Sequence, residues 1–329
     1  MKKCDTGPRA DNRGILDPAR LRREVRFRRL PPAPALLPYV EHYWLVDWDL
    51  DAPFEQRVLP HPAINLVFRR DPAGSVVSES AEVAGVGRDL FRIILAGTGR
   101  VSGVQFRPGG FRPFWPRPVA ELTGERRPLP AGLVAGRHPC DGTDDERAAT
   151  LDALLLAWHP RPITTSASTA AANNPAALTA TPSAADAPAT DLPVAGPPTT
   201  DLPATSLPAV EPLTAEVMAL AGEIRVDRSV LRVDDLARRH GTTTRRLQRL
   251  FLDHVGVSPK WVIRRYRIQE AIEHAAGGGP VDWAAVAADL GYADQAHLIR
   301  EFATATGLTP AAYARSLNRP AGASLSRPG

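Results

Sequence analysis

The chain has 329 residues with a formal net charge of +4 at pH 7, and 43% of its residues are hydrophobic. This length indicates two domains rather than one, and so mild a positive charge does not by itself indicate a polyanionic partner. No apolar run approaches the roughly 18 residues that span a bilayer, and residues 1–13 lack the apolar segment of a signal peptide. We therefore expect a cytoplasmic protein that does not bind membranes.

In chain order, we expect residues 1–29 to form a flexible N-terminus and residues 30–159 to form a β-rich domain. Aromatic and β-branched residues, which favour strands, gather in Tyr39–Leu50, Ala63–Arg69, Glu82–Val86 and Phe91–Phe106. Gly97 and Gly99 predict a turn inside the last of these segments, and Arg107–Gly110 predicts another. This part of the chain is therefore expected to be a sheet with one or two covering helices.

A helix is predicted at Asp144–Trp158, because leucines and a tryptophan recur there at helical spacing behind three acidic residues. Residues 160–211 are dominated by Ala, Thr, Pro and Ser and contain no aromatic residue. Such a segment buries too little apolar surface to offset its ordering entropy. We interpret it as a disordered linker extended by its prolines, with a structured proline-rich domain as the alternative. Residues 318–329 are expected to be a flexible tail.

Residues 212–317 are predicted to be all helical, and one pattern occurs there twice. Each copy has an Ala four residues before a Gly, then a Leu four residues before a Phe, then a Gly-x-Ser/Thr-Pro sequence. A small Ala lets a second helix cross closely, and Gly permits a positive φ in the turn between two helices. The Leu and Phe share the inner face of the second helix, and the Pro suits the first turn of the next. The positions in this pattern are Ala237, Gly241, Leu247, Phe251, Pro259, Ala287, Gly291, Leu298, Phe302 and Pro310.

These repeats predict two helix-turn-helix units, so the outward faces of their second helices are candidate DNA contacts. With Leu247 and Phe251 inward, Arg245, Gln248 and Arg249 share the other side. Arg and Gln are the residue types that contact base edges in the major groove with two hydrogen bonds, whereas the alternative is an ordinary solvated face. His297 has an equal alternative as a packing residue. The candidates are Thr244, Arg245, Gln248 and Arg249 in the first unit and Gln295, His297 and Arg300 in the second.

Charge distinguishes the two units. Residues 231–268 contain ten Lys or Arg against three acids, whereas residues 269–315 contain two against six. Because phosphate neutralisation drives affinity for DNA, the first unit is expected to bind more strongly. Between the units, Pro259–Ala276 is predicted to be one helix of roughly 27 Å, which would set the two units about one DNA turn apart.

Residues from about 213 to 317 resemble the DNA-binding domain of the AraC/XylS family. The stretches that carry this resemblance are Gly241–Phe251, Gly256–Pro259, Gly291–Phe302 and Gly307–Pro310. The resemblance implies a seven-helix domain that binds double-stranded promoter DNA, with RNA polymerase as a further partner. It assigns base reading to Arg245, Gln248, Arg249, Gln295 and Arg300. Ala296 and Ile299 depart from the family, since neither side chain can hydrogen bond to a base.

The N-terminal half resembles an uncharacterised sensor-like domain found in some regulators of this family. The matching stretches are Leu37–Val46, Leu59–Phe68 and Gly103–Gly110. The resemblance implies binding of a small-molecule effector or formation of a homodimer. Aromatic residues that could line an apolar pocket, or alternatively form a core, are Trp44, Trp48, Phe68, Phe106, Phe111 and Trp115.

Two other classes of function are alternatives to an effector-controlled regulator. An enzyme is disfavoured because the chain has no nucleophile elbow, phosphate loop, HExxH motif or cysteine cluster. We therefore expect no catalytic residue, cofactor or metal, and His42, His61 and His138 are interpreted as structural. Cys4 and Cys140 give no disulfide framework or zinc spacing. Cys140 as a redox or alkylation sensor is the remaining alternative, although no activating partner is visible nearby.

Overall fold

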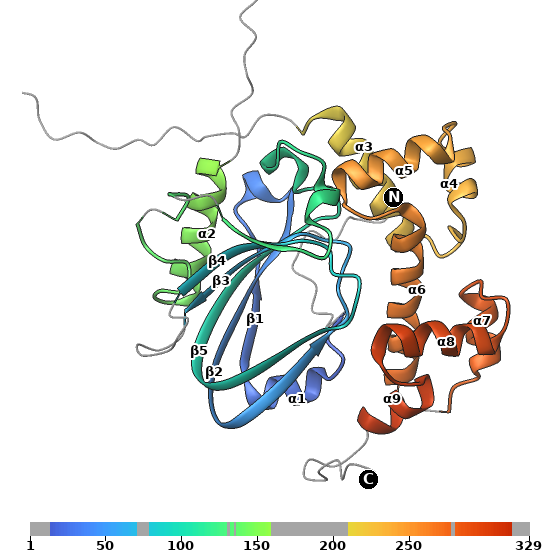
Figure 1. Ribbon diagram of the computed structural model, residues 1–329, viewed down its shortest axis with the longest axis horizontal. Coiled ribbons are helices and arrows are strands. Elements are labelled where there is room, and N and C mark those ends of the chain that lie inside the picture. The colour runs from blue at the N-terminus through green and yellow to red at the C-terminus, as the bar shows by residue number, and fades with distance from the viewer. Residues whose placement is uncertain are drawn as a thin grey trace, which may run out of the picture. The chain divides into compact units, whose positions relative to one another are not determined.

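The computed structural model describes residues 14–70, 79–129, 132–134, 136–158, 210–277 and 280–317 (Figure 1). The expected tail at 318–329 lies outside these residues, as does the expected linker at 160–211 except for its last two positions. No helix of the described segments is long and apolar enough to cross a membrane.

Among the described residues, the N-terminal part is built on one antiparallel sheet of six strands in the order β1-β2-β5-β3-β4-β6. The strands are β1 (Arg26–Leu30), β2 (Val40–Val58), β3 (Asn65–Arg70), β4 (Glu79–Ala84), β5 (Phe91–Phe106) and β6 (Arg126–Pro128). Helix α2 (Asp144–Trp158) covers one face, and short 3-10 helices lie at Pro34–Leu36 (η1), Arg112–Phe114 (η2) and Val119–Leu122 (η3). The predicted β-rich domain with a covering helix is confirmed.

The long strands β2 and β5 pair along almost their whole length, so the expected turn at Gly97 and Gly99 is wrong. Gly97 has a φ of +56° and lies beside the register shift between Leu50 and Phe54. Gly99 pairs with Trp48, whose ring lies where a Cβ on Gly99 would be. The glycines therefore accommodate a bulge and a tryptophan ring within one continuous strand.

The two faces of β2 are used differently, as the period of two in a strand requires. On one face, the Tyr43 hydroxyl donates to Asp152 of α2 at 2.6 Å. The fully buried Arg147 of α2 bonds Asp47 on the same face at 2.7 Å. These contacts hold α2 against the sheet, which leaves the opposite face to line a cavity.

Helix α1 (Pro18–Glu24) and all but the last residue of strand β1 lie within residues 1–29, so the expected flexible N-terminus is wrong for residues 14–29. Asp17 caps α1 by accepting from the Arg20 amide at 2.9 Å, and proline occupies its first turn. Strand β1 carries three arginines, and Arg28 pairs with Asp47 and Asp144 rather than with apolar neighbours. Ion pairs stabilise this strand in place of the apolar alternation that a sequence pattern can reveal.

The C-terminal part has seven helices among residues 210–277 and 280–317, as the resemblance implied. They are α3 (Pro212–Val226), α4 (Val233–Arg239), α5 (Thr244–His254), α6 (Pro259–Ala276), α7 (Trp283–Asp289), α8 (Gln295–Thr306) and α9 (Pro310–Leu317). The predicted helix Pro259–Ala276 is confirmed as α6, which joins the α4–α5 pair to the α7–α8 pair.

Candidate nucleic-acid interface and effector cavity

Helices α4 and α5 form the first helix-turn-helix unit. Leu247 and Phe251 are completely buried on the inner face of α5, and Ala237 of α4 is buried beside them. Gly241 in the turn has a φ of +56°, which disfavours any side chain there. The Thr243 hydroxyl caps α5 by accepting from the Arg246 amide at 3.2 Å. These positions fix which side of α5 is turned outward.

Helices α7 and α8 repeat this arrangement. Leu298 and Phe302 are completely buried, and Ala287 of α7 is 1% exposed. Gly291 has a φ of +68°, and Asp294 caps α8 by accepting from the His297 amide at 2.6 Å. Pro259 and Pro310 occupy the first turns of the helices that follow the two units, α6 and α9. Each unit is thus packed against a further helix.

The outward face of α5 carries side chains without intramolecular partners. Arg245, Gln248 and Arg249 are exposed, and Thr244 is half-buried. Among the described residues, no hydrogen bond or ion pair engages the side chains of Arg245, Gln248 or Arg249. Guanidinium and amide groups on this face are therefore available to an external ligand.

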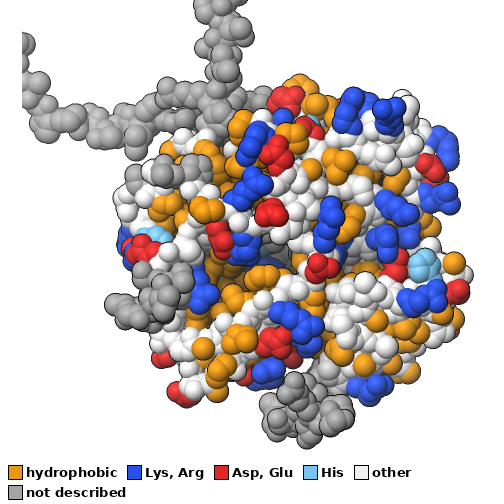
Figure 2. Space-filling view, in the orientation of Figure 1, with side chains coloured by type: hydrophobic (Ala, Val, Ile, Leu, Met, Phe, Trp, Pro, Cys, Tyr) orange, Lys and Arg blue, Asp and Glu red, His pale blue; other side chains and the backbone are white. Residues whose placement is uncertain are grey.

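Most of the neighbouring basic side chains are engaged within the protein. Arg246 bonds both carboxylate oxygens of Glu216 in α3, at 2.5 and 3.0 Å. Arg239 pairs with Glu223 and with Asp227, the latter at 2.6 Å. Other engaged arginines in the α4–α6 region are Arg238 with Asp235, Arg264 with Glu301, Arg265 with the Arg88 carbonyl and Arg267 with the Leu231 carbonyl. In Figure 2, Lys and Arg side chains gather over the region of α4, α5 and the start of α6.

The outward face of α8 is less basic. Gln295 and Arg300 are exposed, and neither side chain has an intramolecular partner in the described part of the chain. His297 is half-buried, with its ring edge-on to Tyr292 and Nε2 3.3 Å from Glu301. Glu301 also accepts from Arg264 of α6 at 2.5 Å. His297 is thus engaged in packing, which is the alternative raised for it from the sequence.

The sheet domain contacts helix α3 and the C-terminal end of α5. The Glu41 carboxylate of β2 accepts hydrogen bonds from both terminal guanidinium nitrogens of Arg225 in α3, at 3.1 and 2.9 Å. Both side chains are largely buried. Burial alone would raise the pKa of Glu41, but the hydrogen bonds and charge of Arg225 lower it to about 2. Two contacts hold the C-terminal end of α5: Arg112 with Asp253 at 3.1 Å, and Thr123 with the Gly256 carbonyl at 2.5 Å.

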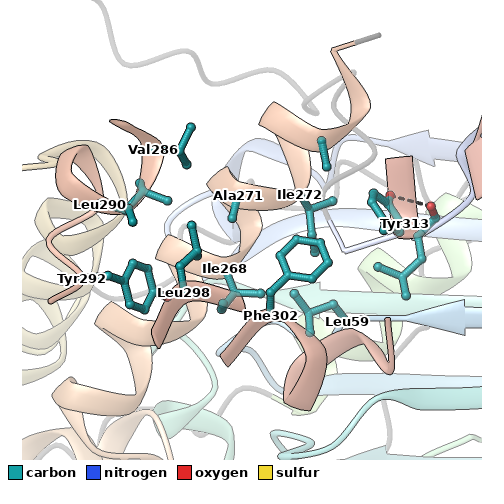
Figure 3. Close-up of a cluster of buried hydrophobic side chains, with 13 residues drawn as sticks. Leu59, Ile268, Ala271, Ile272, Val286, Leu290, Tyr292, Leu298, Phe302 and Tyr313 are labelled. Carbon is teal, nitrogen blue, oxygen red and sulfur yellow. Dashed lines mark hydrogen bonds between the residues drawn. The ribbon is translucent and has the colours of Figure 1, made fainter. Parts of the chain in front are cut away.

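The sheet domain also contacts the second unit. Leu16 and Leu59 are completely or almost completely buried within an apolar cluster formed by α6, α7, α8 and α9 (Figure 3). The Tyr313 hydroxyl of α9 donates to the Leu16 carbonyl at 2.6 Å. In the same segment as Leu59, His61 lies 3.3 Å from Nε2 of Gln269 in α6. The chain around residues 59–61 therefore joins the sheet domain to the helix between the two units.

A cavity of about 410 Å³ lies on the face of the sheet opposite α2. Trp44, Val46 and Trp48 of β2 form part of its wall, and His42 and His61 contribute polar atoms. Of the six aromatic residues considered for a pocket, only Trp44 and Trp48 line it. The other four aromatic residues pack against rings outside the cavity. Phe106, Phe111 and Trp115 belong to a cluster with Phe114 and Trp158, and Phe68 packs against His138.

Cys140 is completely buried, and its thiol donates to the Phe68 carbonyl at 3.2 Å. Burial raises the pKa of this thiol, which opposes formation of the reactive thiolate. Within the described ranges, no three His, Cys, Asp or Glu side chains cluster in a way that could hold a metal ion.

Sequence reasoning did not find the residues that join the two parts of the chain. Glu41 and Arg225 are separated by 184 positions, and neither stands in a motif. Leu59 lies in a stretch that resembled the sensor-like domain, but its burial among C-terminal helices has no local signature. Only the folded structure brings these side chains together.

Comparison with known protein families finds one match in the N-terminal part of the chain and one in the C-terminal part. Residues 236–316 match the family described as a helix-turn-helix domain, and residues 28–128 match a domain of unknown function, DUF6597. No curated protein matches the chain.

Among solved structures, ToxT from Vibrio cholerae at 1.65 Å resolution is similar with 11% identity and a TM-score of 0.33, over 84% of this chain and 98% of that one. ToxT bound to (E)-4-(8-methylnaphthalen-1-yl)but-3-enoic acid is similar with 11% identity and the same TM-score, over 89% and 99% of the two chains. Scores this low do not establish a shared fold.

Proposed function

We propose that this chain, an AraC-type DNA-binding transcription regulator with an N-terminal DUF6597 domain, reads its operator with the outward face of α5 and is modulated through its N-terminal cavity. One observation carries the first half of this proposal. Among the described residues, Arg245, Gln248 and Arg249 have no intramolecular partner, whereas most neighbouring arginines are engaged by carboxylates or carbonyls.

The residue types on α5 favour base reading over phosphate contact alone. Arg makes two hydrogen bonds to guanine, and Gln makes two to adenine. Arg245, Gln248 and Arg249 lie at i, i+3 and i+4, so they project to one side of the helix. Thr244, in the first turn of α5, would contact a phosphate beside them.

The second unit contributes fewer contacts in this proposal. Gln295 at the start of α8 and Arg300 one turn later would face an adjacent segment of the major groove. Their surroundings carry a net negative charge, since residues 269–315 contain six acids and two basic residues. Repulsion between these acids and phosphates would weaken binding there, so the first unit would supply most of the affinity. His297 is better explained by its contacts with Tyr292 and Glu301.

Selection from a random DNA pool tests this reading of α5. The full chain should enrich one motif, and the Arg245→Ala/Arg249→Ala variant should lose at least about 30-fold in affinity for it, from roughly 1 kcal/mol or more per contact. Arg22→Ala, which removes one exposed arginine from α1, serves as the control and should bind as the parent does. Salt-sensitive binding without an enriched motif would reject sequence-specific reading.

The second half of the proposal is control by a small molecule in the N-terminal cavity. Val58, Pro60 and His61 form part of the cavity wall, and Leu59 between them is packed among the C-terminal helices. His61 also contacts Gln269 of α6. A ligand that displaced this wall segment would act on the helix that spaces the two DNA-binding units.

A double-mutant cycle tests this coupling without a known ligand. Val67→Trp places a large side chain in the cavity, and Gln269→Met removes the contact with His61 while keeping a similar volume. We expect Val67→Trp to change DNA affinity at least about fivefold, a typical allosteric coupling, and Gln269→Met to suppress most of that change. The control Ile94→Trp, at an exposed position of β5, should have no effect. Purely additive effects would contradict coupling through this segment.

A further inference from the structure

The sheet forms the floor of the N-terminal cavity, and one aromatic ring lies flat on it. Trp44 of β2 lines the cavity and pairs with Gly103 of β5. A Cβ on Gly103 would overlap the Trp44 indole and would lie nearer to Cε2 than to Cζ2 and Nε1, the two atoms bonded to Cε2 on that edge. A point beside the ring edge would have the opposite order, so the indole covers the Gly103 backbone with its face. The other face of the indole is therefore turned away from the sheet, toward the cavity.

The second tryptophan of the cavity, Trp48, is enclosed instead. It is only 4% exposed, it covers Gly99, and the Arg69 guanidinium lies over its ring, 5.6 Å from the centroid. Trp44 is half-buried, and no aromatic ring or guanidinium of the described residues stacks on it. Aromatic rings associate by offset stacking between their faces. Trp44 therefore offers a platform on which a planar ring can stack.

A polar side chain lies at one edge of this platform. Nε1 of Trp44 donates to Oδ1 of Asn65 at 3.2 Å, which turns that edge of the indole toward Asn65. Asn65 of β3 pairs with Gln105 of β5, and Gln105 also lines the cavity. Among the described residues, no hydrogen bond engages the Gln105 side chain, and its amide atoms are not closed off from solvent. Gln105 thus presents an N–H donor and a carbonyl acceptor beside the platform.

These two features together restrict the chemistry of the ligand. A primary amide makes two hydrogen bonds to a group that carries a donor next to an acceptor in one plane, as glutamine does with adenine. A lactam or carboxamide on an aromatic ring carries such a pair. The cavity volume of about 410 Å³ lies within the roughly 300–1,000 Å³ typical of small-molecule sites. Arg29 and Arg69 also line the cavity, so an anionic aromatic ligand is the competing chemistry.

We propose that this cavity binds a planar aromatic small molecule with a lactam or carboxamide edge, its ring stacked on Trp44 and its amide edge hydrogen bonded to the side chain of Gln105. The inference rests on the proposed function only in taking the cavity as the effector site. Binding to the cavity needs no DNA, so its failure is distinguishable from a failure of operator reading or of coupling to the DNA-binding units.

Titration calorimetry of the full chain with three matched probes tests the proposal. The probes are 2-quinolone, N-methyl-2-quinolone, in which a methyl replaces the amide hydrogen, and 2-naphthoate, an anion of similar size. We expect 2-quinolone to bind saturably and about five- to tenfold more tightly than its N-methyl derivative, as one lost hydrogen bond implies. It should also bind more tightly than 2-naphthoate. Tightest binding of 2-naphthoate, equal binding of the two quinolones, or no saturable binding would each overturn the proposal.

One pair of variants tests the hydrogen bonds to Gln105. Gln105→Met keeps a similar volume and should bring the ratio of the two quinolone affinities to about one while both probes still bind, which also shows that the variant is folded. The matched control is Gln56→Met, because Gln56 lines the cavity but its amide donates to the Arg57 carbonyl at 3.1 Å. This control should keep the ratio of the parent. Loss of the preference in both variants, or in neither, would show that the assignment to Gln105 is wrong.

A second set of variants tests stacking on Trp44. Trp44→Leu should weaken binding of both quinolones about three- to tenfold and leave their ratio unchanged, as loss of one aromatic contact implies. Trp44→Phe keeps a smaller ring and should recover part of this loss, and cooperative thermal unfolding shows that each variant is folded. The control Trp115→Leu removes a tryptophan from the aromatic cluster outside the cavity and should leave both affinities unchanged. Unchanged affinities in Trp44→Leu, or an equal loss in Trp115→Leu, would contradict stacking on Trp44.

Discussion

Replacing Glu41 by Gln should destabilise the protein in a pH-dependent way. Gln keeps the size of the side chain but removes the charge that Arg225 binds through two hydrogen bonds. The pKa of Glu41 is lowered from 4.5 to about 2 in the folded protein. Each unit of such a shift corresponds to about 1.4 kcal/mol, so the substitution should cost roughly 3 kcal/mol at pH 7.

The pH dependence follows from the direction of this shift. Because the folded pKa is depressed, the stabilisation is fully present above the unfolded value of 4.5 and is lost as pH falls toward 2. The difference between parent and Glu41→Gln should therefore shrink to less than half, about 1.4 kcal/mol, near pH 3.

Urea unfolding followed by tryptophan fluorescence at pH 7, 5 and 3 measures this difference. The matched control is Glu55→Gln, because Glu55 pairs with Arg92 at 3.4 Å with both side chains about half exposed. An exposed pair of this kind contributes about 1 kcal/mol or less. Equal stability of parent and Glu41→Gln at pH 7, or a difference that does not change with pH, would refute the reasoning.

Two further predictions concern glycine and cysteine. Gly241→Ala should lower the free energy of unfolding by about 1 kcal/mol because of its positive φ alone, since no atom lies within 4 Å of the added Cβ. Gly291→Ala should lower it further, because its Cβ would lie 2.7 Å from Leu231. Equal midpoints of unfolding for the two variants would contradict this. Cys140 should react with a thiol reagent only as fast as the protein opens, because it is completely buried; rapid labelling of the folded chain would restore the sensor alternative.

Local chemistry explains why some elements could be predicted from the sequence. Helix α6 begins and ends at the predicted residues because Ser258 caps it and Gly277 follows it. The paired helices follow from Ala, Gly, Leu and Phe at fixed spacing, with Gly241 and Gly291 both at positive φ. Each of these signals acts within a few residues of the place it specifies.

The rest depends on contacts between distant residues. Strand β1 could not be predicted from the sequence, because it is stabilised by ion pairs of Arg28 with Asp47 and Asp144 and lacks a clear apolar pattern. The sequence around Gly99 indicates a turn, because the Trp48 ring that lies over Gly99 belongs to the neighbouring strand and leaves no local pattern. The candidate DNA contacts are in turn distinguished from their paired neighbours only once the partners of each arginine are known.

The central claim is that Arg245 and Arg249 read bases. Its most direct test replaces each base pair of the selected site singly and measures affinity for the parent, Arg245→Ala and Arg249→Ala. We predict that the parent loses roughly 1–3 kcal/mol at each contacted base pair. Each variant should become indifferent to base identity at one or two adjacent positions and keep its discrimination elsewhere. A uniform loss of affinity with unchanged discrimination at every position would contradict base reading and reduce both arginines to phosphate contacts.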